Sequence, residues 1–201
     1  MGLVSPGPTL ALRAPDSAAP GPAQARIIEA ALKLFAIHGV GGTSLQMIAS
    51  EIGVTKAAVY HQYRTKAEII QAVAEAELDR LESALDSAEA DGGADAARRR
   101  QAVLERIVDL AVERRRQVGT LLNDPVIGRL YAKDERLLAV LGRLNDLLMG
   151  PGAGPQSRLA TAMLTAAISG AVIHPLVAGQ NDAALRAQLV LLMGRLLELP
   201  A

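Results

Sequence analysis

The chain has 201 residues, half of them apolar, which suffices for one or two small domains with a hydrophobic core. Alanine and leucine make up a third of the chain and aromatic residues only 2%, so the composition predicts an all-α fold and excludes a mainly β fold. Cysteine is absent, which excludes disulfides and thiolate metal sites, and the formal charge of zero identifies no partner.

Residues 1–22 are predicted to form a disordered tail, because five of the ten prolines lie there without any apolar periodicity. The prolines interrupt any apolar run, so this segment does not resemble a secretory signal. The uncharged stretch from Leu159 to Asn181 contains Thr161, His174 and Pro175, and we interpret it as a buried helix rather than a membrane span. We therefore expect a cytoplasmic protein.

Four helices are predicted at the start of the ordered chain. Apolar residues recur at helical spacing over 24–38, and Gly39 ends that helix. The runs 43–46 and 65–68 are capping boxes, with Thr43 and Thr65 as N-caps, and Thr55 is a further N-cap candidate. Residues 24–64 are thus expected to form three short helices, followed by a longer helix from 66 to about 90.

Further helices are expected at 95–122, 126–149, 156–179 and 182–198, separated by segments rich in Pro, Gly, Asn and Asp. Eight acids between Glu75 and Asp95 are assigned to the solvent face of the helix 66–90. The arginine triplets 98–100 and 114–116 are interpreted as solvated or paired with nearby acids. The predicted domains are 23–68 and 69–201.

A helix-turn-helix is indicated by residue types at fixed offsets. Ala49 is small where a second helix would cross, and Gly53, four positions on, supplies a turn residue that tolerates positive φ. The apolar residues between such helices are Leu45, Ile48, Ile52, Val54 and Val59.

The second of these helices would present its N-terminal residues to the major groove of DNA. Those residues are Thr55, Lys56, Ala57, Tyr60 and His61. Hydroxyl and ammonium groups suit phosphates and base edges, and a methyl group suits thymine. Thr43 and Lys66 begin the flanking helices, where backbone N–H groups bind phosphate.

Residues 26–70 resemble the DNA-binding domain of the TetR family of bacterial transcriptional repressors. The run 26–39 is similar to the first helix of that family, Thr43–Ala49 to its second, and 53–66 to its recognition helix and the start of helix four. Ala57, Gln62 and Tyr63 depart from the residues common at those positions, which bears on operator sequence. The resemblance implies a homodimer on a palindromic operator and a ligand pocket among the C-terminal helices.

The helices 156–179 and 182–198 are the predicted dimer interface. Small residues and one histidine recur every fourth position, which favours close approach of another helix. They are Ala162, Ala166, Gly170, His174 and Ala178, and the next helix has Leu185, Leu189, Leu192 and Leu196 on one face. In the alternative interpretation, both stripes face their own core.

The effector is expected to be a small apolar molecule, because aromatic residues are scarce and aliphatic residues and methionine dominate the C-terminal part. Met149 and Met163 are candidate wall residues, and Asn123, Tyr131 and His174 are candidate polar contacts, although a structural role is the commoner one for each. No cofactor or metal is expected.

An enzyme is disfavoured because the chain has no cysteine, no metal spacing among its three histidines and no phosphate-binding loop motif. The other alternative is a ligand-binding or adaptor protein whose helix-turn-helix no longer binds DNA. The retained Thr55, Lys56, Tyr60 and Lys66 favour a DNA-binding transcriptional regulator, with repression as the expected mode.

Overall fold

The computed structural model describes residues 20–198 except 116, 118–123 and 132–133, and the described elements are all helical, which confirms the all-α prediction. The predicted disordered tail lies almost wholly outside the described residues. The helices are α1 (Pro22–Gly42), α2 (Leu45–Ile52), α3 (Lys56–Gln62), α4 (Lys66–Gly92), α5 (Ala96–Glu113), α7 (Pro125–Tyr131), α8 (Glu135–Met149), α9 (Pro155–Ile173), the short 3-10 helix η1 (Pro175–Val177) and α10 (Asp182–Leu196).

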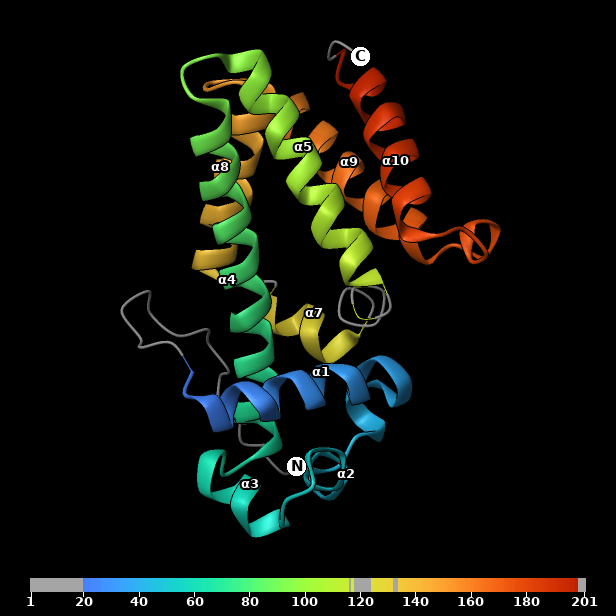
Figure 1. Cartoon of the computed structure of the whole chain (residues 1–201). Coiled ribbons are helices and arrows are strands. Elements are labelled where there is room, and N and C mark those ends of the chain that lie inside the picture. Colours follow the sequence, from blue (N-terminus) through green and yellow to red (C-terminus); the bar gives the residue numbers. More distant parts are fainter. Residues whose placement is uncertain (1–19, 116, 118–123, 132–133, 199–201) are drawn as a thin grey trace, which may run out of the picture.

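The first core lies among α1, α2, α3 and the start of α4, at the bottom of Figure 1. Phe35, Ile48 and Val59 are fully enclosed there. The expected break at Gly39 is present, since this glycine has φ 71° within α1. The kink lets Val40 turn back into the core, where it is 2% exposed.

Helix α4 belongs to two cores and joins them without a linker (Figure 1). Its first turns place Ile69 and Ala74 in the N-terminal core, and Leu78 and Leu85 lie in the C-terminal core. The two cores therefore meet inside α4, several residues beyond the expected boundary at 68/69. Ile127 of α7 also packs into the first core, so the C-terminal part contributes to it.

The C-terminal core lies among α4, α5, α8, α9 and α10. Helices α4 and α5 are in close contact at Gly92, where an added Cβ would lie 2.3 Å from the Cα of Arg99. Glycine is therefore required at this crossing. Leu104, Leu144 and Ile168 are enclosed at the centre of the second core.

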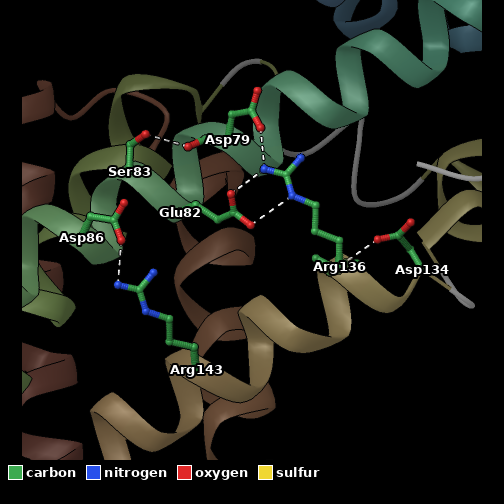
Figure 2. Close-up of polar contacts among 8 residues, drawn as sticks. Asp79, Glu82, Ser83, Asp86, Asp134, Arg136 and Arg143 are labelled. Atoms are coloured by element: carbon green, nitrogen blue, oxygen red, sulfur yellow. Dashed lines mark hydrogen bonds and ion pairs between the residues drawn. The ribbon is translucent and has the colours of Figure 1, made fainter. Parts of the chain in front are cut away.

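The acids of α4 do not simply face solvent, contrary to the expectation from sequence. Figure 2 shows Arg136 of α8 between Asp79 and Glu82, with 2.6 Å to Asp79 Oδ1 and 3.0 Å from Nε to Glu82 Oε1. About two helical turns further along α8, Arg143 donates a hydrogen bond to Asp86 of α4 at 2.7 Å. The hydrogen bond to Glu82 raises the pKa of Arg136, so its guanidinium group stays charged. The ion pairs of Arg136 and Arg143 with acids of α4 therefore tie α8 to α4.

Two expected helices are shorter than the sequence suggested. The segment 126–149 is divided into α7 and α8, because Asp134 caps α8 by accepting from the Leu137 N–H at 2.8 Å. The segment 156–179 ends at Ile173, since Pro175 begins η1. Helix α5 ends at Glu113, and most of the rest of the expected helix 95–122 lies outside the described residues.

Several arginines of the two triplets have structural partners, which include backbone carbonyls as well as an acid. Arg99 and Arg100 donate to the carbonyl groups of Gly93 and Leu197, at 2.9 and 3.2 Å. Arg115 pairs with Asp182 at 3.1 Å, and Arg116 lies outside the described residues. Among the helices that the structure describes, none is long and apolar enough to cross a membrane.

Candidate nucleic-acid interface

The turn between α2 and α3 has the geometry that its sequence demands. Gly53 adopts φ 72° and ψ 33°, and its N–H donates to the carbonyls of Ala49 and Ser50. Val54 N–H also donates to the Ala49 carbonyl, at 2.9 Å. Ala49 has no exposed surface, so a larger side chain there would separate α2 from its neighbours. The left-handed turn thus fixes the angle at which α3 leaves α2.

Helix α3 begins at the cap predicted for it. The Thr55 hydroxyl accepts from the Ala58 N–H at 3.2 Å. Val59 is fully buried beneath the helix, whereas Lys56, Ala57 and His61 are exposed.

The exposed face of α3 combines a ring, a hydroxyl and positive charge. The side chain of Tyr60 is 44% exposed, whereas Phe35 and Tyr63, the other aromatic residues of this domain, are buried. The Lys56 ammonium lies 5.5 Å from the centre of its ring, which holds the two side chains together. The predicted residues Thr55, Lys56, Ala57, Tyr60 and His61 therefore share one exposed surface, which we call the α3 face.

Thr43 has a different place from the one predicted. Its side chain is 2% exposed, and its hydroxyl donates to the Gly39 carbonyl at 2.9 Å. Ser44 is the N-cap of α2 instead, accepting from the Met47 N–H at 3.2 Å. Two adjacent hydroxyl residues fit the same pattern in sequence, and only packing decides which becomes the cap.

Lys66 joins the start of α4 to the last turn of α1. Its ammonium donates to the Gly41 carbonyl at 3.1 Å, and the side chain is half-buried. Thr65 caps α4 as predicted, by accepting from the Glu68 N–H. The Glu68 carboxylate in turn accepts from the Arg64 N–H at 2.8 Å and from the Thr65 hydroxyl at 3.3 Å, rather than from the backbone N–H of the cap residue. Lys66 thus ties the end of α1 to the start of α4.

Positive charge remains unpaired at the start of α3 and just beyond its end, because the acids of the domain have other partners. Glu51 pairs with Lys33, and Glu29 pairs with two arginines outside the domain. Lys56 and Arg64 are exposed, and neither forms an ion pair within the described ranges. Arg64 was not singled out from the sequence. Its place between the cap of α4 and the end of α3 is the signal that identifies it.

A second candidate site is a cavity of about 500 Å³ among α4, α5, α8 and α9. Its described walls are mainly aliphatic, and Glu77, Arg114, Thr165 and Ser169 add polar groups. The other described lining residues are Leu78, Leu81, Ile107, Leu110, Ala111, Leu137, Leu141, Leu144 and Ala166.

None of the predicted ligand residues whose side chains the structure describes is among the residues that line this cavity. Met163 is 64% exposed on α9, and Met149 packs against the C-terminal core. His174 caps η1, accepting from the Leu176 N–H at 3.2 Å through Nδ1. Asn123 lies outside the described residues, and so does the side chain of Tyr131, the last residue of α7. The walls of this cavity come from four helices, so its lining residues share no local sequence pattern.

The sequence of the N-terminal helix-turn-helix domain is similar to that of known transcriptional regulators. Residues 27–73 match the family model of the bacterial regulatory proteins, tetR family. HTH-type transcriptional regulator SrpR of Pseudomonas putida is 48% identical over 48 residues, which are 24% of this chain and 22% of SrpR. HTH-type transcriptional regulator TtgR, also of Pseudomonas putida, is 46% identical over 50 residues, which are 25% of this chain and 24% of TtgR. The match thus spans about a quarter of these curated relatives.

The whole fold has solved counterparts. A TetR-like regulator from Rhodococcus sp. RHA1 superposes with a TM-score of 0.68 at 18% identity, covering 90% of this chain and 99% of that one. The fatty acid degradation regulator FadR from Bacillus halodurans gives a TM-score of 0.68 at 20% identity, covering 88% and 96%. The architecture is that of a helix-turn-helix domain on a helical C-terminal domain. Residues 27–73 thus match the helix-turn-helix domain of the tetR family, and the remaining helices share the fold of solved regulators described as TetR-like.

Proposed function

We propose that the protein is a sequence-specific DNA-binding repressor that acts as a homodimer on a palindromic operator and releases it when a small apolar molecule binds. The observation that carries this proposal is the α3 face, which lies on a complete helix-turn-helix. This helix-turn-helix falls within residues 27–73, which match the model of a family of bacterial regulatory proteins. The N-terminal match to named HTH-type transcriptional regulators supports DNA binding.

The α3 face has the chemistry for both parts of DNA recognition. Lys56 and Arg64 supply unpaired positive charge for phosphates, and Tyr60 supplies a hydroxyl for the backbone. Thr55 and Ala57 offer a hydroxyl and a methyl group to base edges. One seven-residue helix contacts few bases, so a second copy one helical turn away supplies the remaining specificity.

The exposed surface of α9 and α10 supports a homodimer. The small residues Ala162, Ala166, Gly170 and Ala178 are all exposed in the protomer, as is His174. Beside them lie exposed Leu159, Met163 and Ile173 on α9, and Leu191, Leu192 and Leu196 on α10. Leu185 and Leu189 belong to the protomer core instead, so only part of the leucine stripe is available to a partner.

The cavity among α4, α5, α8 and α9 supports regulation by a small molecule, because α4 also forms part of the N-terminal core. A ligand that binds the DNA-released arrangement of α4 more tightly than the DNA-bound one shifts the population toward release. The aliphatic walls favour an apolar ligand.

The decisive test is selection of bound sequences from randomised duplex DNA by the purified protein, followed by binding titrations at several salt concentrations. We expect one palindrome to be enriched and its affinity to fall steeply with salt. Lys56→Ala and Tyr60→Ala should weaken binding, whereas Arg98→Ala, which removes an exposed charge from α5, should leave it nearly unchanged. Enrichment of no sequence at low salt would refute the proposal and favour a ligand-binding or adaptor protein.

A further inference from the structure

The cavity among α4, α5, α8 and α9 is enclosed on one side and open on another. On the enclosed side, Oε1 of Glu77 has almost no exposed surface and lies 3.5 Å from Nη1 of Arg114. Burial there raises the pKa of Glu77, although Arg114 and Arg80 lower it. On the open side, two of the described lining residues, Leu141 of α8 and Ala166 of α9, are exposed. The mouth of the cavity therefore lies between α8 and α9.

This mouth opens on the surface that we propose for dimerisation. Ala166 belongs to the stripe of small residues on α9, and Met163 and Gly170 on the same face are exposed as well. Leu138, about one helical turn before Leu141 on α8, is 57% exposed. Because Leu141 and Ala166 line one cavity, the exposed apolar surface of α8 is continuous with that of α9.

The α9 side of the mouth carries no charge that a partner would have to bury. The sequence has no Asp, Glu, Lys or Arg from Leu159 to Asn181. On α8, Arg136 and Arg143 extend toward α4 and pair with its acids, as Figure 2 shows. An apolar rim with small, uncharged residues favours contact with a second protein surface over contact with water.

We propose, resting on the homodimer of the proposed function, that the partner protomer closes the mouth of the cavity, so that the complete ligand site exists only in the dimer. An apolar ligand in the open cavity of a monomer leaves part of its surface in water, and the partner removes this part from water. Covering about 55 Å² of apolar ligand surface changes the affinity about tenfold. By linkage, the ligand strengthens dimerisation by the same factor at each of the two sites.

The test uses N-phenyl-1-naphthylamine, a neutral apolar probe whose fluorescence rises in apolar surroundings, with the full-length protein and without DNA. Leu192→Arg places a charge on the exposed apolar face of α10, outside the described lining of the cavity, and should give a folded monomer by circular dichroism and sedimentation. We expect this monomer to bind the probe at least tenfold more weakly than the wild-type dimer. Ile37→Arg makes the same kind of change at an exposed residue of α1 and should leave binding within twofold of wild type.

Two further variants tie the effect to the cavity and do not depend on the folding of Leu192→Arg. Leu192→Ala should only weaken the dimer, and saturating probe should then lower its dimer dissociation constant about hundredfold in sedimentation equilibrium, tenfold for each site. Leu110→Trp, added to Leu192→Ala, fills part of the cavity from α5. In this double variant the probe should leave the dimer dissociation constant within twofold of its value without probe.

Closure by the partner and the homodimer itself fail through different results. Equal binding of the probe to the wild-type dimer and to the Leu192→Arg monomer would overturn closure by the partner and leave the homodimer standing. A dimer dissociation constant of Leu192→Ala that the probe leaves unchanged, or no saturable binding of the probe to the wild-type dimer, would do the same. Wild-type protein that sediments as a monomer at every concentration would refute the homodimer of the proposed function.

Discussion

Gly170 offers a sharp test of the proposed dimer, because the protomer does not need a glycine there. The residue is exposed in the middle of α9, and an added Cβ meets no atom within 4 Å. In the isolated protomer, Gly170→Arg should therefore cause no clash. It should stabilise the helix by about 0.5–1 kcal/mol, since arginine is a much better helix former than glycine.

The proposed dimer reverses this expectation. Gly170 lies four residues after Ala166 on the exposed stripe of small residues, where a partner helix would approach closely. A buried charge without a partner costs about 3–5 kcal/mol, and symmetry places one such charge on each protomer. A total near 6 kcal/mol raises the dimer dissociation constant by about four orders of magnitude.

Sedimentation equilibrium over a range of micromolar concentrations measures this constant directly. Gly142→Arg is the matched control, because Gly142 is also exposed in mid-helix, on α8, with nothing within 4 Å of an added Cβ. Wild type and Gly142→Arg should sediment as dimers, and Gly170→Arg as a folded monomer by circular dichroism. Dimerisation of Gly170→Arg with the wild-type constant would refute the α9 interface.

Three other outcomes follow from single sites. Gly53→Ala should lower the free energy of unfolding by about 1–2 kcal/mol in urea titrations, because alanine disfavours φ 72°, whereas Gly41→Ala, without a positive φ, should not. The raised pKa of Glu77 means that the folded state binds more protons, so the free energy of unfolding should fall as pH rises above 4.5 through the raised pKa; Glu77→Gln should lose this fall in urea titrations from pH 4 to 7. Glu29→Gln should leave ligand binding intact but reduce the ligand-induced change in operator affinity about fivefold, because it removes ion pairs of Glu29 worth about 1 kcal/mol in total. An unchanged ligand-induced change in operator affinity would show that the contact between Glu29 and Arg114 does not transmit the effect of the ligand.

The helix-turn-helix was predictable because its determinants are local. A small residue, a glycine four positions on and apolar residues at helical spacing are steric requirements of two crossing helices. Gly53 and Ala49 satisfy them within one short segment, and the structure places both as expected. The same local logic identified the caps Thr55 and Thr65.

Prediction from sequence failed at two kinds of feature. At one, two neighbouring residues could both have been the helix cap. At the other, the structure depends on contacts between elements far apart in the chain. Thr43 and Ser44 are both good caps, and burial of Thr43 left the role to Ser44. Asp134 resembled an interior residue of one long helix until its cap bond showed a helix start. The cavity draws its walls from four helices, so no periodicity in any one of them identifies Glu77 or Arg114 as its polar end.

Under the proposed function, the contact between Glu29 and the arginines is the structural link from the cavity to the N-terminal domain. Glu29 lies on α1, and its partners are 51 and 85 positions further along the chain. Arg80 extends from α4 and Arg114 from the end of α5, so the Glu29 carboxylate is held by two of the four helices that line the cavity. A ligand that separates α4 from α5 must either break one of these bonds or move α1 with the arginines. Because α1 packs in one core with the buried face of α3, either outcome changes how the α3 face is presented to DNA.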